Sequence, residues 1–186
     1  RSTKKIVTPT TDETHDDDAL DHPTTNDIVI RTYDTNDTLY TDQTGRFPHL
    51  SSRGNRYQMV LYHVGSNTIW VEPMKTRNEE EMITARTRAL QRMGMCNIKP
   101  HRQVLDNEAS AAYKKAIKES DMDYQLVPPD DHRRNAAEKA IQTWKDHFVA
   151  VLSGTANNFP MHLWCQAIPQ MERQLNLLRQ SNIHPK

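Results

Sequence analysis

The chain has 186 residues with 24 basic and 24 acidic side chains, so its formal net charge is zero. Its hydrophobic content of 35% is low but allows one domain with a polar tail. Two cysteines without a CxxC pair argue against a disulfide scaffold or a cysteine-rich zinc site, and no apolar run is long enough to cross a membrane.

Charge is distributed unevenly along the chain. Residues 1–42 carry four basic and ten acidic side chains, whereas residues 43–186 carry 20 basic and 14 acidic ones, which fits a body that binds a polyanion. Residues 1–26 are rich in Thr and Asp, and we expect them to be mobile because few apolar side chains are available for burial. We predict an acidic linker over 1–36 and one domain over 37–186. No signal peptide opens the chain, so we expect it not to be secreted. It begins at Arg1 and stops at Lys186 without a tail, so we expect it to be a piece of a longer protein.

Three strands are predicted first. A short strand over 38–41 runs into Asp42. Two further strands, over 57–64 and 68–71, flank the turn sequence at 65–67. A three-residue loop containing Gly between two such runs predicts a β-hairpin.

Helices and strands then alternate. Asn78 followed by three glutamates predicts a helix N-terminus, and this helix should run to about Gly94. A strand follows over 101–105, and Ser110 can cap the next helix. A short strand over 124–127 is stopped by two prolines.

Two amphipathic helices complete the chain. Each has apolar residues at helical spacing, which predicts one buried face. We interpret their tryptophans and methionine as core or interface residues. The apolar stripe of the first, ended by Gly154, is Ala137, Ile141, Trp144, Phe148, Val151 and Leu152; that of the second, over 160–179, is Leu163, Trp164, Ala167, Ile168, Met171, Leu175 and Leu178. The order of elements predicts an α/β fold, a mixed sheet with helices on its faces.

Three carboxylates are placed where a site could form. Asp42 and Asp106 end strands, and Glu138 lies in the first turn of the long helix. Clusters of oxygen ligands suit Mg²⁺ or Mn²⁺. Three alternatives stay open at this point: the acids are simply solvated, Asp106 and Asn107 form a turn, or Asn135 and Glu138 form a capping box.

Five segments in order resemble the integrase catalytic core of LTR retrotransposons and retroviruses. Segments 41–48, 52–57 and 69–74 resemble the opening of that core, 104–108 resembles its second aspartate motif, and 135–138 resembles its glutamate helix. The resemblance extends over about residues 38–182. It implies an RNase H-like fold, with three antiparallel strands followed by alternating helices and strands and with flanking helices.

The resemblance also implies a function. Asp42, Asp106 and Glu138 would be the catalytic D,D,E triad that coordinates two Mg²⁺ (or Mn²⁺) ions. The reactions would be removal of nucleotides from the 3′ ends of the element and strand transfer into target DNA. Element-end DNA, target DNA and further copies of the chain would be the partners, with no membrane. The nucleus of the host cell, reached via a cytoplasmic particle, would be the location.

The sequence departs from the family pattern at two places. The 31 residues between Asp106 and Glu138 are fewer than is common in the family, and Asn135 stands where Gly is frequent. Asn is a good substitute for Gly in a left-handed conformation, so the loop can keep its path.

Two residues after Glu138 are candidates for binding DNA. Family members often carry basic residues four and seven positions after the glutamate. Lys145 matches the second of these positions, whereas Gln142 replaces the basic residue at the first, which is a further departure from the family pattern. At 100° per residue the three side chains share one flank of the helix. Lys145 would therefore reach a phosphate held at Glu138, while a solvated lysine is the alternative.

The loop before the glutamate helix supplies further candidates. His132, Arg133 and Arg134 would contact phosphates beside the metals, with a solvated loop as the alternative. We also include Asn107, next to Asp106, among the candidate DNA-binding residues. Two other functions stay open: another RNase H-like transposase or nuclease, and a catalytically inactive relic that only binds DNA.

Overall fold

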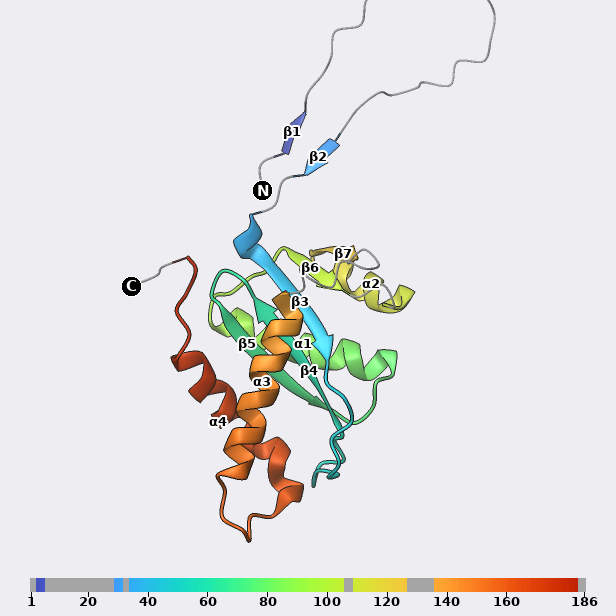
Figure 1. Ribbon diagram of the computed structural model, residues 1–186. Coiled ribbons are helices and arrows are strands. Elements are labelled where there is room, and N and C mark those ends of the chain that lie inside the picture. Colours follow the sequence, from blue (N-terminus) through green and yellow to red (C-terminus); the bar gives the residue numbers. More distant parts are fainter. Residues whose placement is uncertain (1–2, 6–28, 32–33, 106–108, 127–135, 184–186) are drawn as a thin grey trace, which may run out of the picture. The chain divides into compact units, whose positions relative to one another are not determined.

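A computed structural model describes residues 3–5, 29–31, 34–105, 109–126 and 136–183. The chain forms two compact units, Arg1–Tyr33 and Asp34–Lys186. In the first unit, β1 (Thr3–Lys5) pairs antiparallel with β2 (Val29–Arg31), and the sequence did not predict these strands (Figure 1). We expected residues 1–26 to be mobile, and most of them lie outside the described residues. The boundary at 36/37 stays a prediction about domain organisation.

The second unit is built on a five-stranded mixed sheet with the order β5-β4-β3-β6-β7. The first three strands are antiparallel, whereas β6 is parallel to β3 and β7 is parallel to β6. This confirms the predicted α/β fold class and the predicted order of elements. The strands are β3 (Thr38–Gln43), β4 (Tyr57–His63), β5 (Thr68–Met74), β6 (Arg102–Leu105) and β7 (Asp123–Leu126).

The predicted hairpin is confirmed as β4 and β5, paired from Tyr57 with Met74 to His63 with Thr68. Its turn places Asn67 in the left-handed region, with φ 52°, a conformation that Asn tolerates better than most residues. The second strand runs farther than predicted and includes Pro73. Proline is tolerated there because β5 is an edge strand, where one side of the backbone needs no sheet partner.

Four α-helices are described, and their starts follow the predicted caps where those are visible. The Asn78 side chain accepts a hydrogen bond from the Glu81 backbone N–H (3.0 Å), and Ser110 accepts one from Tyr113 (3.1 Å). The last helix begins at Trp164, later than predicted, because a short 3-10 turn, η3 (Met161–Leu163), precedes it. The helices are α1 (Glu79–Met95), α2 (Ala111–Glu119), α3 (Ala136–Ser153) and α4 (Trp164–Leu177).

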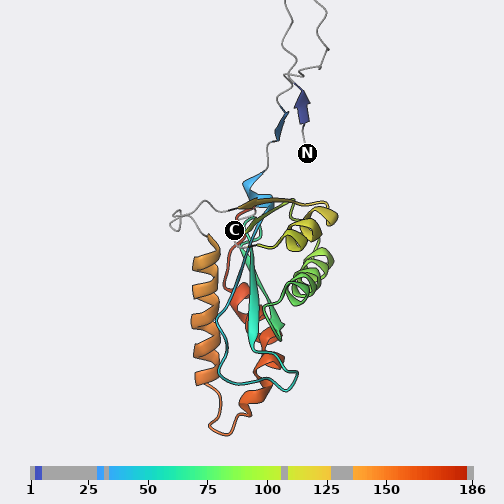
Figure 2. The ribbon, with the colours of Figure 1, turned by 90° about the vertical axis from the view of Figure 1, so that its right-hand side faces the viewer.

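The helices cover both faces of the sheet, with α1 and α2 on one face and α3 and α4 on the other (Figure 2). On the α3/α4 face, the predicted stripe residues Ile141, Trp144 and Phe148 are buried against Val60 and Val71. One predicted stripe residue is wrong: Leu178 is 83% exposed, because α4 ends at Leu177 and the chain turns away.

Candidate functional site

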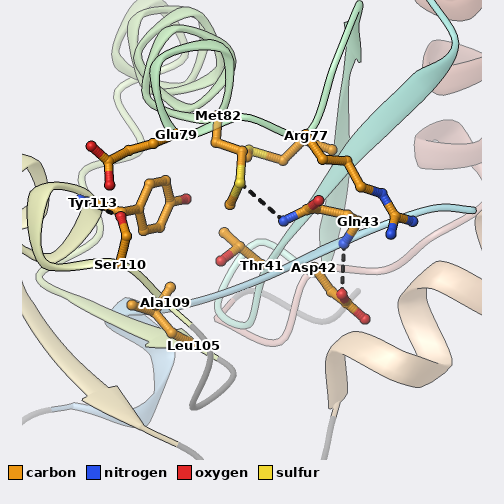
Figure 3. Close-up of a pocket in the computed structure, with 11 residues that line it drawn as sticks. Thr41, Asp42, Gln43, Arg77, Glu79, Met82, Leu105, Ala109, Ser110 and Tyr113 are labelled. Carbon is orange, nitrogen blue, oxygen red and sulfur yellow. Dashed lines mark hydrogen bonds between the residues drawn. The ribbon is translucent and has the colours of Figure 1, made fainter.

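Asp42 lies near the end of β3, at the predicted strand end. Its carboxylate is half-buried, and Oδ1 accepts a hydrogen bond from the Gln43 backbone N–H (2.6 Å). Figure 3 shows the carboxylate pointing away from the side chains of Thr41 and Gln43, because neighbouring residues of a strand point to opposite faces. Asp42 therefore presents its charge to the face opposite Thr41.

The sheet register identifies that face. Asp42 pairs with Val60 of β4, and side chains directly opposite each other in an antiparallel pair lie on the same face. Val60 packs in the core with Ile141 and Trp144 of α3. Asp42 thus lies on the face that α3 covers.

The predicted residues of α3 are on its exposed side. Glu138 lies in the first turn of α3, and Glu138, Gln142 and Lys145 are all exposed. The Gln142 amide donates a hydrogen bond to Asp146 Oδ1 (2.7 Å), one helical turn on. Of these residues, Lys145 borders a shallow cavity of about 240 Å³ between α3 and the segment after β3.

The remaining predicted residues, Asp106, Asn107, His132, Arg133 and Arg134, lie outside the described residues. The described part of β6 ends at Leu105, one position before the second predicted aspartate.

The described carboxylates fit a hard cation in chemistry but do not by themselves form a full site. Among the residues that the structure describes, no three His, Cys, Asp or Glu side chains come close enough together to hold a metal ion. Carboxylate oxygens such as those of Asp42 and Glu138 are of the type that suits Mg²⁺ or Mn²⁺. A third donor would have to come from a position such as Asp106.

A cavity of about 470 Å³ lies between β3, α1 and α2, and Asp42 borders it together with Thr41 and Gln43 (Figure 3). Its wall includes Tyr113, whose pKa is raised by burial although a hydrogen bond from Gln103 lowers it in part. Gln103 donates to the hydroxyls of Thr41 (2.9 Å) and Tyr113 (3.2 Å), and its carbonyl accepts from the buried Arg86 (2.7 Å). This network ties β3, β6, α1 and α2 together directly behind Asp42.

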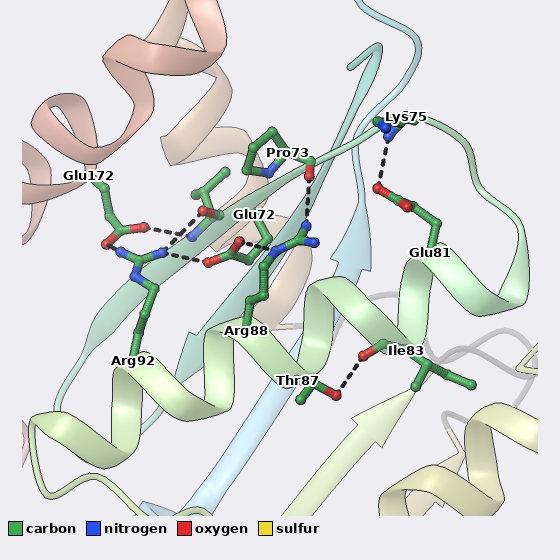
Figure 4. A network of polar contacts seen from close by, with 10 residues as sticks. Glu72, Pro73, Lys75, Glu81, Ile83, Thr87, Arg88, Arg92 and Glu172 are labelled. Carbon is green, nitrogen blue, oxygen red and sulfur yellow. Dashed lines mark hydrogen bonds and ion pairs between the residues drawn. The ribbon is translucent and has the colours of Figure 1, made fainter. Parts of the chain in front are cut away.

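A second polar network joins α1 and α4 at the β5 edge of the sheet (Figure 4). Arg92 pairs with Glu72 (2.8 Å) and with Glu172, while Arg88 also reaches Glu72 (3.0 Å). Burial raises the pKa of Glu172, opposed by the neighbouring Arg92, and Glu172 also accepts from the Val71 N–H (2.8 Å).

Sequence reasoning missed both networks. Burial of Arg86, Glu72 and Glu172 cannot be read from residue type, because charged residues are normally exposed. The sequence analysis contains no signal for these partners, because each network joins residues from separate elements.

Comparisons with known proteins fix the fold family. No protein-family model matches the sequence, and a search of the curated proteins found no match. Among solved structures, the catalytic core domain of BIV integrase matches with a TM-score of 0.59 and 13% identity, over 78% of this chain and 87% of that one. A chain of the simian T-cell lymphotropic virus intasome, solved in complex with PP2A regulatory subunit B56 gamma, matches with a TM-score of 0.63 and 17% identity, over 79% of this chain.

The BIV match is the catalytic core domain of a retroviral integrase, and this chain has the same RNase H-like fold. It spans about half (52%) of the length of the simian viral chain. No helix among the described residues has the length and apolar character needed to cross a membrane.

Proposed function

We propose that this chain is the catalytic core of a retrotransposon-type integrase, in which Asp42, Asp106 and Glu138 hold divalent cations. One observation carries the proposal. Each paired residue of β6 stands 64 positions after its partner in β3, as Tyr40 with Val104 shows. Asp106 stands the same 64 positions after Asp42. Two acids at the same register position of adjacent parallel strands would share one end of the sheet.

The helix α3 supports the third member of the triad. It packs against β3 and β4 on the face to which Asp42 belongs, and Glu138 is exposed in its first turn. Three carboxylates supply the negative charge that holds hard cations without consuming protons. Two such ions, when bound, would activate the attacking oxygen and stabilise the leaving oxygen of an in-line phosphoryl displacement.

The proposed reactions need no covalent enzyme intermediate. In end processing, a water oxygen bonds to phosphorus while the bond from phosphorus to the 3′ oxygen breaks, and that oxygen takes a proton. In strand transfer, the freed 3′ oxygen loses its proton and bonds to a phosphorus of target DNA, while the bond from that phosphorus to the target 3′ oxygen breaks and the released oxygen takes a proton. Lys145, exposed on α3, would hold a phosphate near Glu138 by charge.

The proposal includes the partners and the place of action. The ligands are element-end DNA and target DNA, and several copies of the chain act together, as the intasome neighbour suggests by analogy. His132, Arg133, Arg134, Asn107 and Gln142 would add DNA contacts. The proposed place is the host nucleus, reached via a cytoplasmic particle.

A branched duplex that mimics the strand-transfer product tests the chemistry without knowledge of the element ends, because the reverse reaction uses the same site. We expect a Mg²⁺- or Mn²⁺-dependent product from the wild-type chain. Asp42→Asn, Asp106→Asn and Glu138→Gln keep side-chain shape but remove the charge that the cations need, so each should lower the rate at least about 10³-fold.

The thermal midpoint with and without Mn²⁺ gives a second readout that does not depend on turnover. A ligand that binds only the folded state raises this midpoint, so Mn²⁺ should stabilise the wild type more than Asp42→Asn. DNA binding with no product under any metal would instead support the inactive relic. Equal products from the wild type and Asp42→Asn would refute the assigned site.

A further inference from the structure

The connection between β3 and β4, residues 44–56, is basic and free of acids. It carries Arg46, Arg53 and Arg56, and no Asp or Glu occurs anywhere between Asp42 and Glu72. The connection starts two residues after Asp42, so it leaves the sheet at the proposed catalytic end. We call residues 44–56 the arginine loop.

The backbone of the arginine loop is held at both of its ends. Thr44 N–H donates to the Gln58 carbonyl (2.9 Å), and Phe47 N–H donates to the Arg56 carbonyl (2.7 Å). At the tip, the Ser51 hydroxyl accepts from Asn55 N–H (2.8 Å). A loop with these internal bonds needs little ordering when it meets a ligand.

The loop is also fastened to the neighbouring elements. The Trp164 indole donates to the His49 carbonyl (2.9 Å), and Ser52 N–H donates to the His162 carbonyl (2.6 Å). The Phe47 ring packs against the Trp164 ring, with centroids 4.9 Å apart. Figure 2 shows the loop running from the end of β3 beside α3 toward the connection between α3 and α4. The arginines are therefore displayed from a rigid support.

Two of the three arginines face solvent, and Arg56 is half-buried. Arg46 and Arg53 are exposed, and neither they nor Lys145 forms an ion pair within the described part of the chain. Arg46 and Lys145 border the same shallow cavity, so Arg46 continues the basic surface of α3. Arg53 borders a different cavity, together with Glu72 and Glu81. The nearest acid along α3, Asp146, accepts a hydrogen bond from Gln142.

We propose that the arginine loop, together with Lys145, binds the phosphate backbone of a DNA duplex. This inference rests on the proposed function only in naming DNA as the polyanion. Cations that form no ion pair among the described residues, on a braced loop that starts two residues after Asp42, suit a ligand whose phosphates lie along a line. The contact is to the backbone, so it should not depend on DNA sequence.

The test is the salt dependence of DNA binding in EDTA, where no metal-dependent chemistry takes place. A fluorescein-labelled 25-base-pair duplex is titrated with the full chain at several salt concentrations, and fluorescence anisotropy gives the affinity. Each lost phosphate contact should reduce the slope of log affinity against log salt by about 0.9. For Arg46→Ala/Arg53→Ala we therefore expect a reduction of about 1 to 2, with at least about tenfold weaker binding at low salt.

Matched variants keep the result interpretable. Lys99→Ala/Lys118→Ala also removes two exposed cations, on the α1 and α2 side, and should leave the slope near the wild-type value. Arg46→Lys/Arg53→Lys keeps the charges and should retain the slope. Thermal unfolding confirms that each variant folds. Equal slopes for the arginine-to-alanine and lysine-to-alanine pairs would overturn the proposal.

The outcome is separable from that of the proposed function. Asp42→Asn should lose the metal-dependent product and keep the salt slope, because the loop acts without the metal. A reduced slope in the arginine variants without any metal-dependent product would uphold this surface and reject the integrase chemistry. A metal-dependent product from the wild type, with an unchanged salt slope in the arginine variants, would support the integrase chemistry and reject this DNA-binding surface.

Discussion

The two faces of the sheet are packed in different ways. The α3/α4 face is aromatic: Trp144, Phe148 and Trp164 are buried there, with Phe148 and Trp164 rings 6.0 Å apart. The α1/α2 face is packed mainly by methionines and aliphatic residues, with Trp70 and Tyr113 as its buried rings, and it also buries the cation of Arg86. Asp42 and Glu138 belong to the aromatic face, and the network of Arg86 and Gln103 lies on the opposite face.

This difference shows that buried residues hold the elements in place, while the candidate site residues of α3 lie at the exposed flank of that helix. On the aromatic face, Trp144 is fully buried, while Glu138 and Lys145 on the same helix are exposed. A rigid apolar stripe therefore holds polar groups at its flank. On the other face, Gln103 and Arg86 satisfy one another and hold β3 from behind.

The largest expected effect on stability is on the aromatic face. Trp144→Ala removes a fully buried ring and its hydrogen bond to Gln58 Oε1 (2.5 Å). We expect a loss of about 3–5 kcal/mol in the free energy of unfolding, measured by urea denaturation. Trp144→Phe keeps most of the packing but leaves the Gln58 carbonyl unpaired, so it should cost about 1–3 kcal/mol. Equal stability of wild type and Trp144→Ala would show that this face does not hold the fold.

A smaller effect is expected from the buried cation on the opposite face. No carboxylate pairs with Arg86 in the residues that the structure describes; its partners are neutral, namely Gln103, the Ser120 hydroxyl (2.9 Å), the Ala116 carbonyl and the Met122 sulfur. Arg86→Met removes the charge but leaves the Gln103 carbonyl without its donor. We expect a loss of about 1–3 kcal/mol.

A double-mutant cycle tests whether Arg86 and Gln103 act as a unit. If they do, Arg86→Met/Gln103→Leu should cost at least about 0.5 kcal/mol less than the two single changes together. Strict additivity in urea denaturation would show that the two side chains are independent and that the network does not tie the strands together.

The same contrast explains what could be predicted from sequence. The aromatic face was predicted well, since Ile141, Trp144 and Phe148 fall at helical spacing. On the opposite face, the sequence predicted the helices and strands but not the buried polar residues. Arg86 and Gln103 pair with each other from different elements, and the periodicity of a single element does not indicate such pairs. Asp42 and Glu138 were placed correctly on their elements, but convergence with Asp106 depends on residues that the structure does not describe.

The smallest expected effect concerns pH and has opposite signs on the two faces. His63 lies on the α1/α2 face by alternation with Leu61, and burial lowers its pKa below the ordinary 6.5, opposed by Asp37. The unfolded chain then binds more protons at this position, so stability falls as the pH drops below about 6.5. Glu172 on α4 has a pKa raised by burial, so there the folded chain binds more protons, and stability rises as the pH falls toward the ordinary value of 4.5.

Two substitutions separate these opposing contributions. His63→Asn should flatten the loss of stability on acidification, and Glu172→Gln should steepen it, in urea denaturation followed from pH 7 to pH 5. The slope against pH is the informative quantity, because either change also shifts stability at every pH through altered packing. His49→Asn serves as the control, since His49 is exposed. Parallel pH profiles for all three variants would mean that His63 and Glu172 have the same pKa in the folded chain as in the unfolded chain. The proposed electrostatic difference between the two faces would then be wrong, and the difference in packing would be unaffected.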